Sequence, residues 1–226
     1  MPTLRASVTP AIKAVLFDLD GTLADTAPDL AYALNGVLAE QGRAPLPLDT
    51  IRPAASHGGI ALIRCGFGEG HPGEEALRLR LLDIYQANIA RETHLFPGMA
   101  EVLAEIEARG LNWGVVTNKP AWLTEPLLDA LGLSRRAGCI VSGDTCEQSK
   151  PHPQPILHAC RQVGVTAQEC LYVGDAERDI EAGRRAGTYT LAALFGYISE
   201  NDRPQDWGAD ALIAHPGEIL AWLEPR

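Results

Sequence analysis

Residues 14–22 decide the fold, and they read Ala-Val-Leu-Phe-Asp-Leu-Asp-Gly-Thr. An apolar run that ends at aspartates and a glycine is typical of a buried strand followed by a tight turn. Backbone alternation reverses at Leu19, so that Asp18 and Asp20 can point toward one cleft while Leu19 packs into the core. The pattern therefore predicts two carboxylates at the end of the first strand.

Further apolar runs follow along the chain and alternate with segments of helical period. The predicted strands cover residues 112–117, 139–143, 170–174 and 188–194, with a last one at 209–213. The predicted helices cover residues 99–109, 120–131, 153–163 and 177–186, with a last one at 216–224. Strands that alternate with helices in this way predict an α/β fold with a Rossmann-like, mainly parallel sheet covered on both faces.

The interval 28–92 interrupts this alternation. Apolar residues recur there with helical spacing, first within 30–38 and again within 77–89. The interval is too long for a loop and has amphipathic faces of its own. We therefore predict a core domain made of residues 1–27 and 93–226, with a small helical cap domain, residues 28–92, inserted after the first strand.

Composition excludes several classes of function. The chain has 226 residues and a formal net charge of −10, from 19 basic and 29 acidic residues. A phosphate backbone needs a basic stripe, so we expect no nucleic-acid partner. No apolar run approaches the roughly 18 residues of a membrane span, and residues 1–13 lack the apolar region of a secretory signal. We therefore expect no membrane partner, a cytoplasmic location and five reduced cysteines.

Polar residues stand where four predicted strands end, and these ends meet at one edge of a parallel sheet. The four groups are Asp18 with Asp20, Thr117 with Asn118, Lys150 within Ser-Lys-Pro, and Asp175 with Asp179. Taken singly, each group has an ordinary structural explanation as a helix cap or a turn. Their order along the chain, each at a strand end, favours a functional site instead.

The chemistry that suits this site is phosphoryl transfer. Converging carboxylates repel one another unless a cation lies among them, and ligands made only of oxygen suit Mg²⁺. A carboxylate such as Asp18 can accept a phosphoryl group as an acyl phosphate, while Asp20 can serve as the acid and base. Thr117 and Lys150 would hold the transferring oxygens.

Two further segments are candidates for contact with the substrate. Lys119 could add positive charge at the mouth of the cleft, although a solvated lysine at a helix start explains it equally well. In the cap, Ser56, His57 and Gly58 precede a second glycine and are followed by Arg64. Glycines permit close approach of the backbone, and a helix that starts there offers amide donors to an anion. The alternative for this segment is an ordinary turn before a helix.

At these residues the chain resembles the phosphatases of the haloacid dehalogenase superfamily, with four motifs in order and a helical cap between the first two. The resemblance implies a catalytic group composed of the nucleophile Asp18, the general acid and base Asp20, and the phosphoryl-binding residues Thr117 and Lys150, with Asn118 helping. It also implies Mg²⁺ held by the Asp18 carboxylate, the Asp20 backbone carbonyl and Asp175, with Asp179 supporting the site from behind these ligands.

The resemblance narrows the function but leaves the substrate open. The dehalogenases of the superfamily lack an acid and base at the position of Asp20, which favours phosphate chemistry. Residues 17–26 and 116–120 resemble those of bacterial phosphoglycolate phosphatases most. Residues 113–120, 196–198 and 207–210 resemble those of N-acetylmuramic acid 6-phosphate phosphatases.

The expected function is therefore a Mg²⁺-dependent phosphomonoesterase that acts on a small phosphorylated metabolite, foremost phosphoglycolate. Sugar-phosphate mutases share the four motifs and remain an alternative, as does a binding protein that keeps the fold without catalysis. The sequence allows either a monomer or a homodimer.

Overall fold

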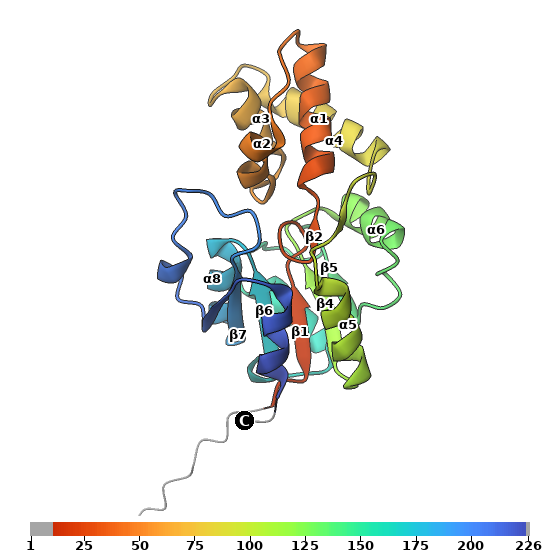
Figure 1. The fold of residues 1–226 in the computed structure, drawn as a ribbon, viewed down its shortest axis with the longest axis vertical. Coiled ribbons are helices and arrows are strands. Elements are labelled where there is room, and N and C mark those ends of the chain that lie inside the picture. The colour runs from red at the N-terminus through yellow and green to blue at the C-terminus, as the bar shows by residue number, and fades with distance from the viewer. Residues whose placement is uncertain (1–10, 225–226) are drawn as a thin grey trace, which may run out of the picture.

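The computed structural model describes residues 11–224 of the chain. A sheet flanked by helices occupies one part of the molecule, and a layer of four helices lies beyond one edge of that sheet (Figure 1). The segment 1–13, in which the sequence predicts no secretory signal, falls almost entirely outside the described residues.

The central sheet has six strands in the order β5-β4-β1-β6-β7-β8, and every neighbouring pair is parallel. The strands are β1 (Ala14–Phe17), β4 (Asn112–Val116), β5 (Cys139–Val141), β6 (Cys170–Gly174), β7 (Tyr189–Ala193) and β8 (Ala211–Ile213). The last residue of β1, Phe17, pairs with Val115 on one side and Val173 on the other. Because this register aligns the strand ends, the residues that follow β1, β4 and β6 emerge at the same edge.

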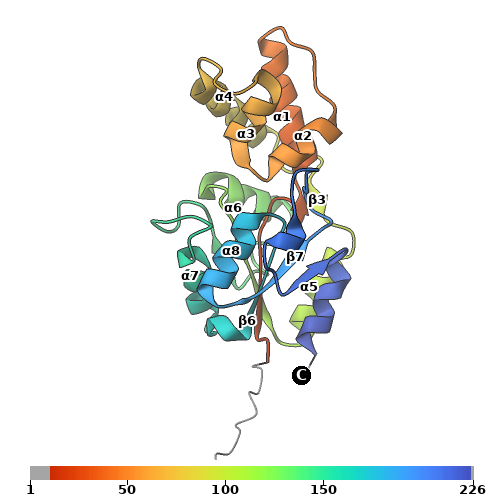
Figure 2. The same ribbon diagram turned by 90° about the vertical axis from the view of Figure 1, so that its left-hand side faces the viewer.

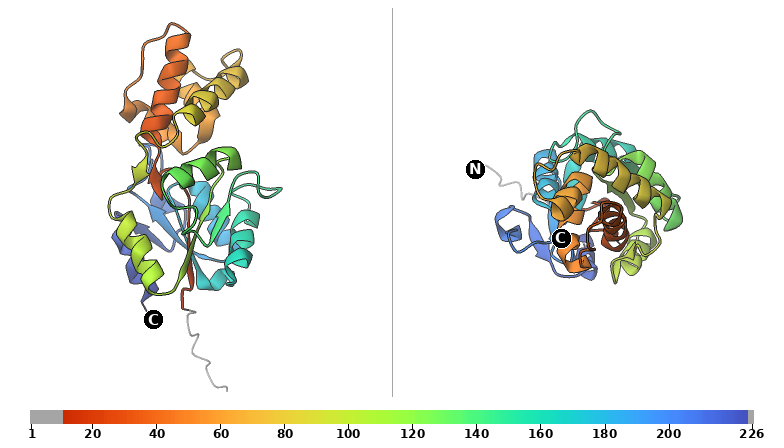
Figure 3. Two further views of the ribbon diagram at one scale, coloured as in Figure 1. Left: turned by 90° about the vertical axis from the view of Figure 1, so that its right-hand side faces the viewer. Right: turned by 90° about the horizontal axis from the view of Figure 1, so that it is seen from above.

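Both faces of the sheet are buried, since successive side chains of β1 enter opposite apolar layers. Val15 and Phe17 belong to the cluster that contains side chains of α5 (Met99–Ala108), α6 (Ala121–Ala130) and the 3₁₀ helix η3 (Pro216–Leu223). Ala14 and Leu16 belong to the cluster that contains side chains of α7 (Gln154–Val163) and α8 (Glu177–Ala186). The two helical layers lie on opposite sides of the sheet (Figure 3).

The separate helical layer comprises α1 (Ala27–Glu40), α2 (Leu48–Ala55), α3 (Gly58–Phe67) and α4 (Glu74–Ala87). The chain leaves the core through β2 (Ala24–Asp25) and returns through β3 (His94–Leu95), and these two short strands pair antiparallel. The four helices stand over the carboxyl edge of the sheet (Figure 2). The predicted α/β fold with helices inserted after the first strand is confirmed. The limits 28–92 for an independent cap domain stay a prediction.

Some predicted limits differ from those in the structure. The strand predicted at 139–143 ends at Val141, because the Ser142 amide donates to the Thr145 hydroxyl and turns the chain. The helix predicted at 216–224 is a 3₁₀ helix. Two-residue strands such as β2 and β3 are too short to produce a periodic pattern. Two further 3₁₀ turns, η1 (Ala167–Glu169) and η2 (Pro204–Asp206), complete the structure.

Within residues 11–224, none of the helices combines the length and the apolar character that a membrane crossing requires.

Candidate active site

A cavity of about 350 Å³ lies between the carboxyl edge of the sheet and the helical layer. Asp18 and Thr117 line it from the sheet, and Ser56 and Tyr85 line it from the helices. Its volume is within the range of small-molecule sites. The cavity therefore joins the predicted catalytic residues to the inserted helices.

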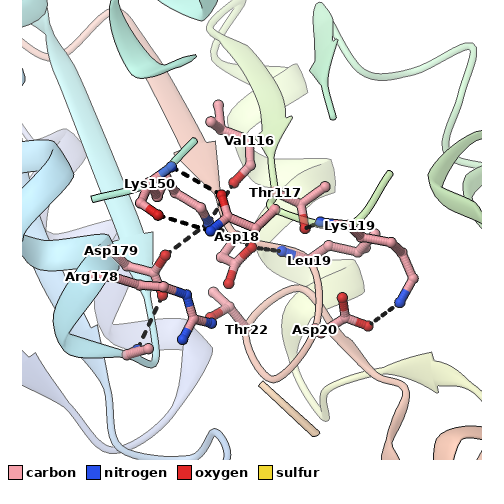
Figure 4. A network of polar contacts seen from close by, with 12 residues as sticks. Asp18, Leu19, Asp20, Thr22, Val116, Thr117, Lys119, Lys150, Arg178 and Asp179 are labelled. Atoms are coloured by element: carbon pink, nitrogen blue, oxygen red, sulfur yellow. Dashed lines mark hydrogen bonds and ion pairs between the residues drawn. The ribbon is translucent and has the colours of Figure 1, made fainter. Parts of the chain in front are cut away.

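At the floor of the site, Lys150 joins two carboxylates (Figure 4). Its ammonium lies 2.8 Å from Asp18 Oδ1 and 2.8 Å from Asp179 Oδ1, and its side chain is completely buried. The same ammonium donates hydrogen bonds to the Val116 carbonyl (2.8 Å) and the Tyr172 hydroxyl (2.9 Å). Four oxygens around one ammonium fix the Lys150 charge beside Asp18.

One lysine does not neutralise the three buried carboxylates at this edge. Burial, followed by the charge of Asp179, raises the pKa of Asp18 to about 6 despite Lys150. Burial and the charges of Asp18 and Asp179 raise the pKa of Asp175 to about 7. Burial also opposes the ionisation of Asp179, but Lys150 and Arg178 outweigh it and hold the pKa of that carboxyl below its ordinary value. The site has an excess of negative charge.

This excess has the composition of a divalent-cation site. One carboxylate oxygen each from Asp18, Asp175 and Asp179 lies within 4.8 Å of the others, and all three residues are buried. Ligands made only of carboxylate oxygen are those that Mg²⁺ prefers. The three aspartates predicted for the metal site are thus close enough together to hold an ion.

Asp175 is oriented by three hydrogen bonds. Its carboxylate accepts from the Ser56 hydroxyl (2.7 Å), the Thr22 hydroxyl (3.1 Å) and the Tyr197 amide (2.9 Å). Gly21 passes so close that a Cβ there would lie 2.2 Å from Asp175 Oδ2, and its φ is +85°. The tight turn after β1 therefore requires glycine for both reasons.

Asp20 points away from Asp18 and Asp179, toward Lys119 (Figure 4). Its Oδ1 accepts hydrogen bonds from the Lys119 ammonium (2.7 Å) and the Thr26 hydroxyl (2.6 Å). Burial disfavours the charge of Lys119, but Asp20 and Tyr85 outweigh it and raise the pKa of that ammonium above its ordinary value. Lys119 is therefore a buried partner of Asp20 and not a solvated lysine.

The residues after β4 also line the cavity. The Thr117 hydroxyl accepts from the Lys119 amide (3.1 Å). The Asn118 side chain accepts from the Lys150 amide (3.0 Å) and donates to the Lys150 carbonyl (2.9 Å). The Asn118 amide group thus holds the backbone of Lys150, while its predicted contact with the phosphoryl group stays a prediction.

The Ser56 segment reaches the catalytic edge, as a contact between the helical layer and the core. Arg178 donates to the Ser56 carbonyl (2.6 Å), and its guanidinium lies 3.3 Å from His57 Nδ1. Burial, followed by the charge of Arg178, lowers the pKa of His57. His57 and Gly58 line the cavity, and both residues are also in contact with solvent.

Arg64 differs from the expectation for a substrate contact. It is absent from the described residues that line the cavity. Its guanidinium donates to both carboxylate oxygens of Glu74, at 2.8 and 3.0 Å, and about half of the side chain is exposed. The ion pair between α3 and α4 accounts for this arginine.

Sequence reasoning missed the residues that join the layers. The Tyr197 hydroxyl accepts from the amides of Thr26 (2.7 Å) and Ala27 (2.8 Å) and donates to Asp25 (2.9 Å). The sequence patterns also did not identify Arg78 and Tyr85 of α4, both of which line the cavity. Helical period alone could have placed Arg78 and Tyr85 on one face of α4, but nothing local to the sequence says what that face covers.

Comparisons with known proteins identify the family. Residues 15–193 match the family model described as haloacid dehalogenase-like hydrolase. The N-acetylmuramic acid 6-phosphate phosphatase of Pseudomonas putida is 45% identical over 210 residues, which cover 92% of this chain and 94% of that protein. The phosphoglycolate phosphatase of Xanthomonas campestris is 42% identical over 217 residues, covering 94% and 98%.

A solved structure shares the fold over nearly its whole length. The crystal structure of a predicted phosphoglycolate phosphatase from Haemophilus somnus superimposes with a TM-score of 0.83 and 26% identity, covering 94% of this chain and 98% of that one. The sequence similarity and the shared fold both support membership of one family, and the aspartate cluster is consistent with it. The chain belongs to the haloacid dehalogenase-like hydrolase family, and within it to the phosphoric monoester hydrolases.

Proposed function

We propose that the protein is a Mg²⁺-dependent phosphomonoesterase that forms an aspartyl-phosphate on Asp18. One observation carries the proposal. Asp18 lines the cavity beside the fully buried Lys150, and one of its carboxylate oxygens lies within 4.8 Å of a carboxylate oxygen of Asp175 and of Asp179. A nucleophile, a fixed cation and oxygen ligands for a metal therefore meet at one point.

The Asp18 carboxylate is held for attack. Its Oδ1 accepts from the Leu19 amide (2.8 Å) and contacts Lys150, so the carboxylate cannot rotate freely. In the first step, a carboxylate oxygen of Asp18 attacks phosphorus and the bond from phosphorus to the ester oxygen breaks. Asp20 gives its proton to the departing alkoxide. Asp20 follows Asp18 by two residues and lines the same cavity, which suits it to protonate the leaving group.

The second step releases phosphate and restores Asp18. Asp20 takes a proton from water, the water oxygen attacks phosphorus, and the bond between phosphorus and Asp18 breaks. The Lys150 ammonium and the Thr117 hydroxyl stabilise the phosphoryl oxygens throughout. The helices above the cavity keep bulk water out during the first step.

The aspartates fit a magnesium ion, and its ligands would be the Asp18 and Asp175 carboxylates with the Asp20 backbone carbonyl. When bound, the ion would supply positive charge that reduces the repulsion between an anionic phosphate and the Asp18 carboxylate. Asp179, which faces Lys150 at 2.8 Å, keeps that lysine in place.

The substrate we propose is a small phosphorylated metabolite, foremost 2-phosphoglycolate, with N-acetylmuramic acid 6-phosphate as the second candidate. Relatives named for each substrate match almost the whole chain at similar identity. A cavity of about 350 Å³ suits a small molecule. The reaction would take place in the cytoplasm.

A phosphate-release assay tests the reaction. The wild-type protein should release phosphate from at least one of 2-phosphoglycolate, N-acetylmuramic acid 6-phosphate and the hexose phosphates. EDTA should stop the release and added Mg²⁺ should restore it. Asp18→Asn should be inactive, since the amide is a poor nucleophile. Substantial turnover by Asp18→Asn would contradict the mechanism, and an isomerised sugar phosphate as the main product would show a mutase.

A further inference from the structure

One face of α4 is directed at the catalytic cavity. Arg78, Leu82 and Tyr85 stand at positions i, i+4 and i+7, which share one side of a helix, and all three line the cavity. In Figures 2 and 3, α4 belongs to the layer that stands over the carboxyl edge of the sheet. Whatever extends from a phosphate bound at Asp18 toward the helices therefore meets this face.

The Tyr85 hydroxyl has an unmet hydrogen-bonding capacity. The side chain is completely buried, and no residue within 11–224 accepts a hydrogen bond from the hydroxyl; the neighbouring Lys119 ammonium interacts with Tyr85 but can only donate. The Lys119 ammonium contacts its ring, 4.7 Å from the centroid. Burial raises the pKa of Tyr85 to about 12, so that the hydroxyl keeps its proton and can donate. A buried hydroxyl whose proton has no acceptor is costly and calls for an explanation. Because Tyr85 lines the cavity, a ligand atom is the natural acceptor.

Arg78 offers a cation with spare donors. Its Nε and Nη2 donate to Glu75, at 2.8 and 2.6 Å, while Nη1 has no hydrogen-bond partner in the part of the chain that the structure describes. The Glu75 side chain is 64% exposed, so this ion pair competes with water and is weak. Gly59 packs on the stem of Arg78: a Cβ there would lie 2.9 Å from Arg78 Cγ. The guanidinium is thus supported beside the cavity and can form a further pair.

The other cations that line the cavity within residues 11–224 are already engaged. Lys119 is paired with Asp20, and Arg178 bonds the Ser56 carbonyl and faces His57. Arg78 is therefore the cation best able to meet a charge on the leaving group. The edge of the guanidinium that carries Nη1 is open, and charge-assisted N–H donors in a planar group suit a carboxylate.

We propose that this α4 face recognises the leaving group, and that the substrate is a phosphate monoester whose alcohol carries a carboxylate: Arg78 pairs with that carboxylate and the Tyr85 hydroxyl donates a hydrogen bond to an oxygen of the alcohol part. The inference rests on the proposed phosphatase function and adds the residues that would recognise the carboxylate of the leaving group. Glycolate and muramic acid, which appear in the names of the two relatives, are both carboxylic acids.

Matched substrate pairs test the proposal. One pair is 2-phosphoglycolate and 2-hydroxyethyl phosphate. The other is N-acetylmuramic acid 6-phosphate and N-acetylglucosamine 6-phosphate, which lacks the lactyl carboxylate. The wild type should prefer the acidic member of at least one pair. Arg78→Gln should lower kcat/KM for that member about 10- to 100-fold, the worth of one charge-assisted hydrogen bond, and change kcat/KM for the neutral member less than about threefold.

Three variants separate recognition from a structural role. Arg80→Gln removes an arginine of α4 that pairs with Glu40 instead, and it should leave both members unchanged. Glu75→Gln breaks the same ion pair as Arg78→Gln but leaves the guanidinium, so it should keep or raise activity on the acidic member. Tyr85→Phe should lower kcat/KM for the acidic member about 10-fold with little change in Tm, since the hydroxyl proton it removes has no acceptor among the described residues.

The outcomes also separate this proposal from the proposed function. Equal losses on both members of a pair, or no loss, would overturn the role of Arg78 while leaving the phosphatase intact. A wild type that hydrolyses p-nitrophenyl phosphate with Mg²⁺ but shows no preference for either acid would overturn the substrate class alone. Only a protein that releases no phosphate from any of these esters would remove the proposed function itself.

Discussion

The hydroxyl of Tyr197 caps α1 from outside the helix, and its removal should loosen the junction between the core and the helical layer. Thr26 stands at the N-terminal end of α1, but its own hydroxyl donates to Asp20 and does not cap the helix. The Tyr197 hydroxyl accepts from the amides of Thr26 and Ala27 and donates to Asp25. Tyr197→Phe keeps the ring and removes these three hydrogen bonds, together with the longer contact between the Tyr197 and Thr26 hydroxyls (3.4 Å).

The expected loss in the free energy of unfolding follows from the buried polar groups that Tyr197→Phe leaves without a hydrogen-bond partner. Two backbone amides and one carboxylate oxygen lose a partner in a site where Tyr197 is 2% exposed. Each buried group left without a partner costs about 1–3 kcal/mol. Asp25 keeps its ion pair with Arg52 at 2.8 Å, which reduces the loss in the free energy of unfolding. We therefore expect Tyr197→Phe to lower the free energy of unfolding by about 2–4 kcal/mol, or Tm by roughly 4–16 °C.

Urea unfolding followed by circular dichroism measures this loss. The matched control is Tyr189→Phe, which removes a hydroxyl from a half-buried tyrosine that packs on Trp222, far from the start of α1. It should change the free energy of unfolding by less than about 0.5 kcal/mol. A loss below about 1 kcal/mol for Tyr197→Phe, or an equal loss for both variants, would refute the capping role.

Three further substitutions have expected outcomes. Gly21→Ala should destabilise the protein by about 2 kcal/mol or more, measured by urea unfolding, because its φ is +85° and its Cβ would meet Asp175 at 2.2 Å; unchanged stability would contradict the tight turn. Arg64→Gln should keep kcat/KM within about twofold of the wild-type value, since the arginine pairs with Glu74 outside the cavity. A large loss of kcat/KM in steady-state kinetics would show that Arg64 contributes to substrate binding after all. Lys150→Met should abolish phosphate release and lower the free energy of unfolding by about 3–5 kcal/mol, because buried carboxylates lose their cation; full activity would contradict its role.

The sequence predicts the core because the relevant signals are local. The apolar run before Asp18 predicts β1, and the alternation of runs and helices predicts a parallel sheet. Once the sheet is parallel, the carboxyl ends of its strands lie along one edge, which brings Asp18, Lys150 and Asp175 together without any knowledge of their distances.

The contacts of the helical layer could not be predicted in the same way. Helical period shows that α4 has two faces, but it does not show that Arg78 and Tyr85 face the nucleophile. The two glycines before Arg64 favour a substrate contact for this residue, yet its guanidinium pairs with Glu74 of the next helix, outside the cavity. Tyr197 acts on α1 from about 170 residues away in sequence, as its hydrogen bond to Ala27 shows. Such pairings depend on how two packed layers meet, which local patterns do not contain.

The most direct test of the central claim is chemical trapping of the phosphorylated enzyme. The protein is mixed with Mg²⁺ and a hydrolysed substrate, quenched within the first turnover and treated with borohydride, which reduces an acyl phosphate to an alcohol. Mass spectrometry of the peptide that contains Asp18 should show homoserine at that position, and the Asp18→Asn variant should show none. Phosphate release at full rate with the Asp18 peptide unmodified at every quench time would contradict an aspartyl-phosphate at Asp18.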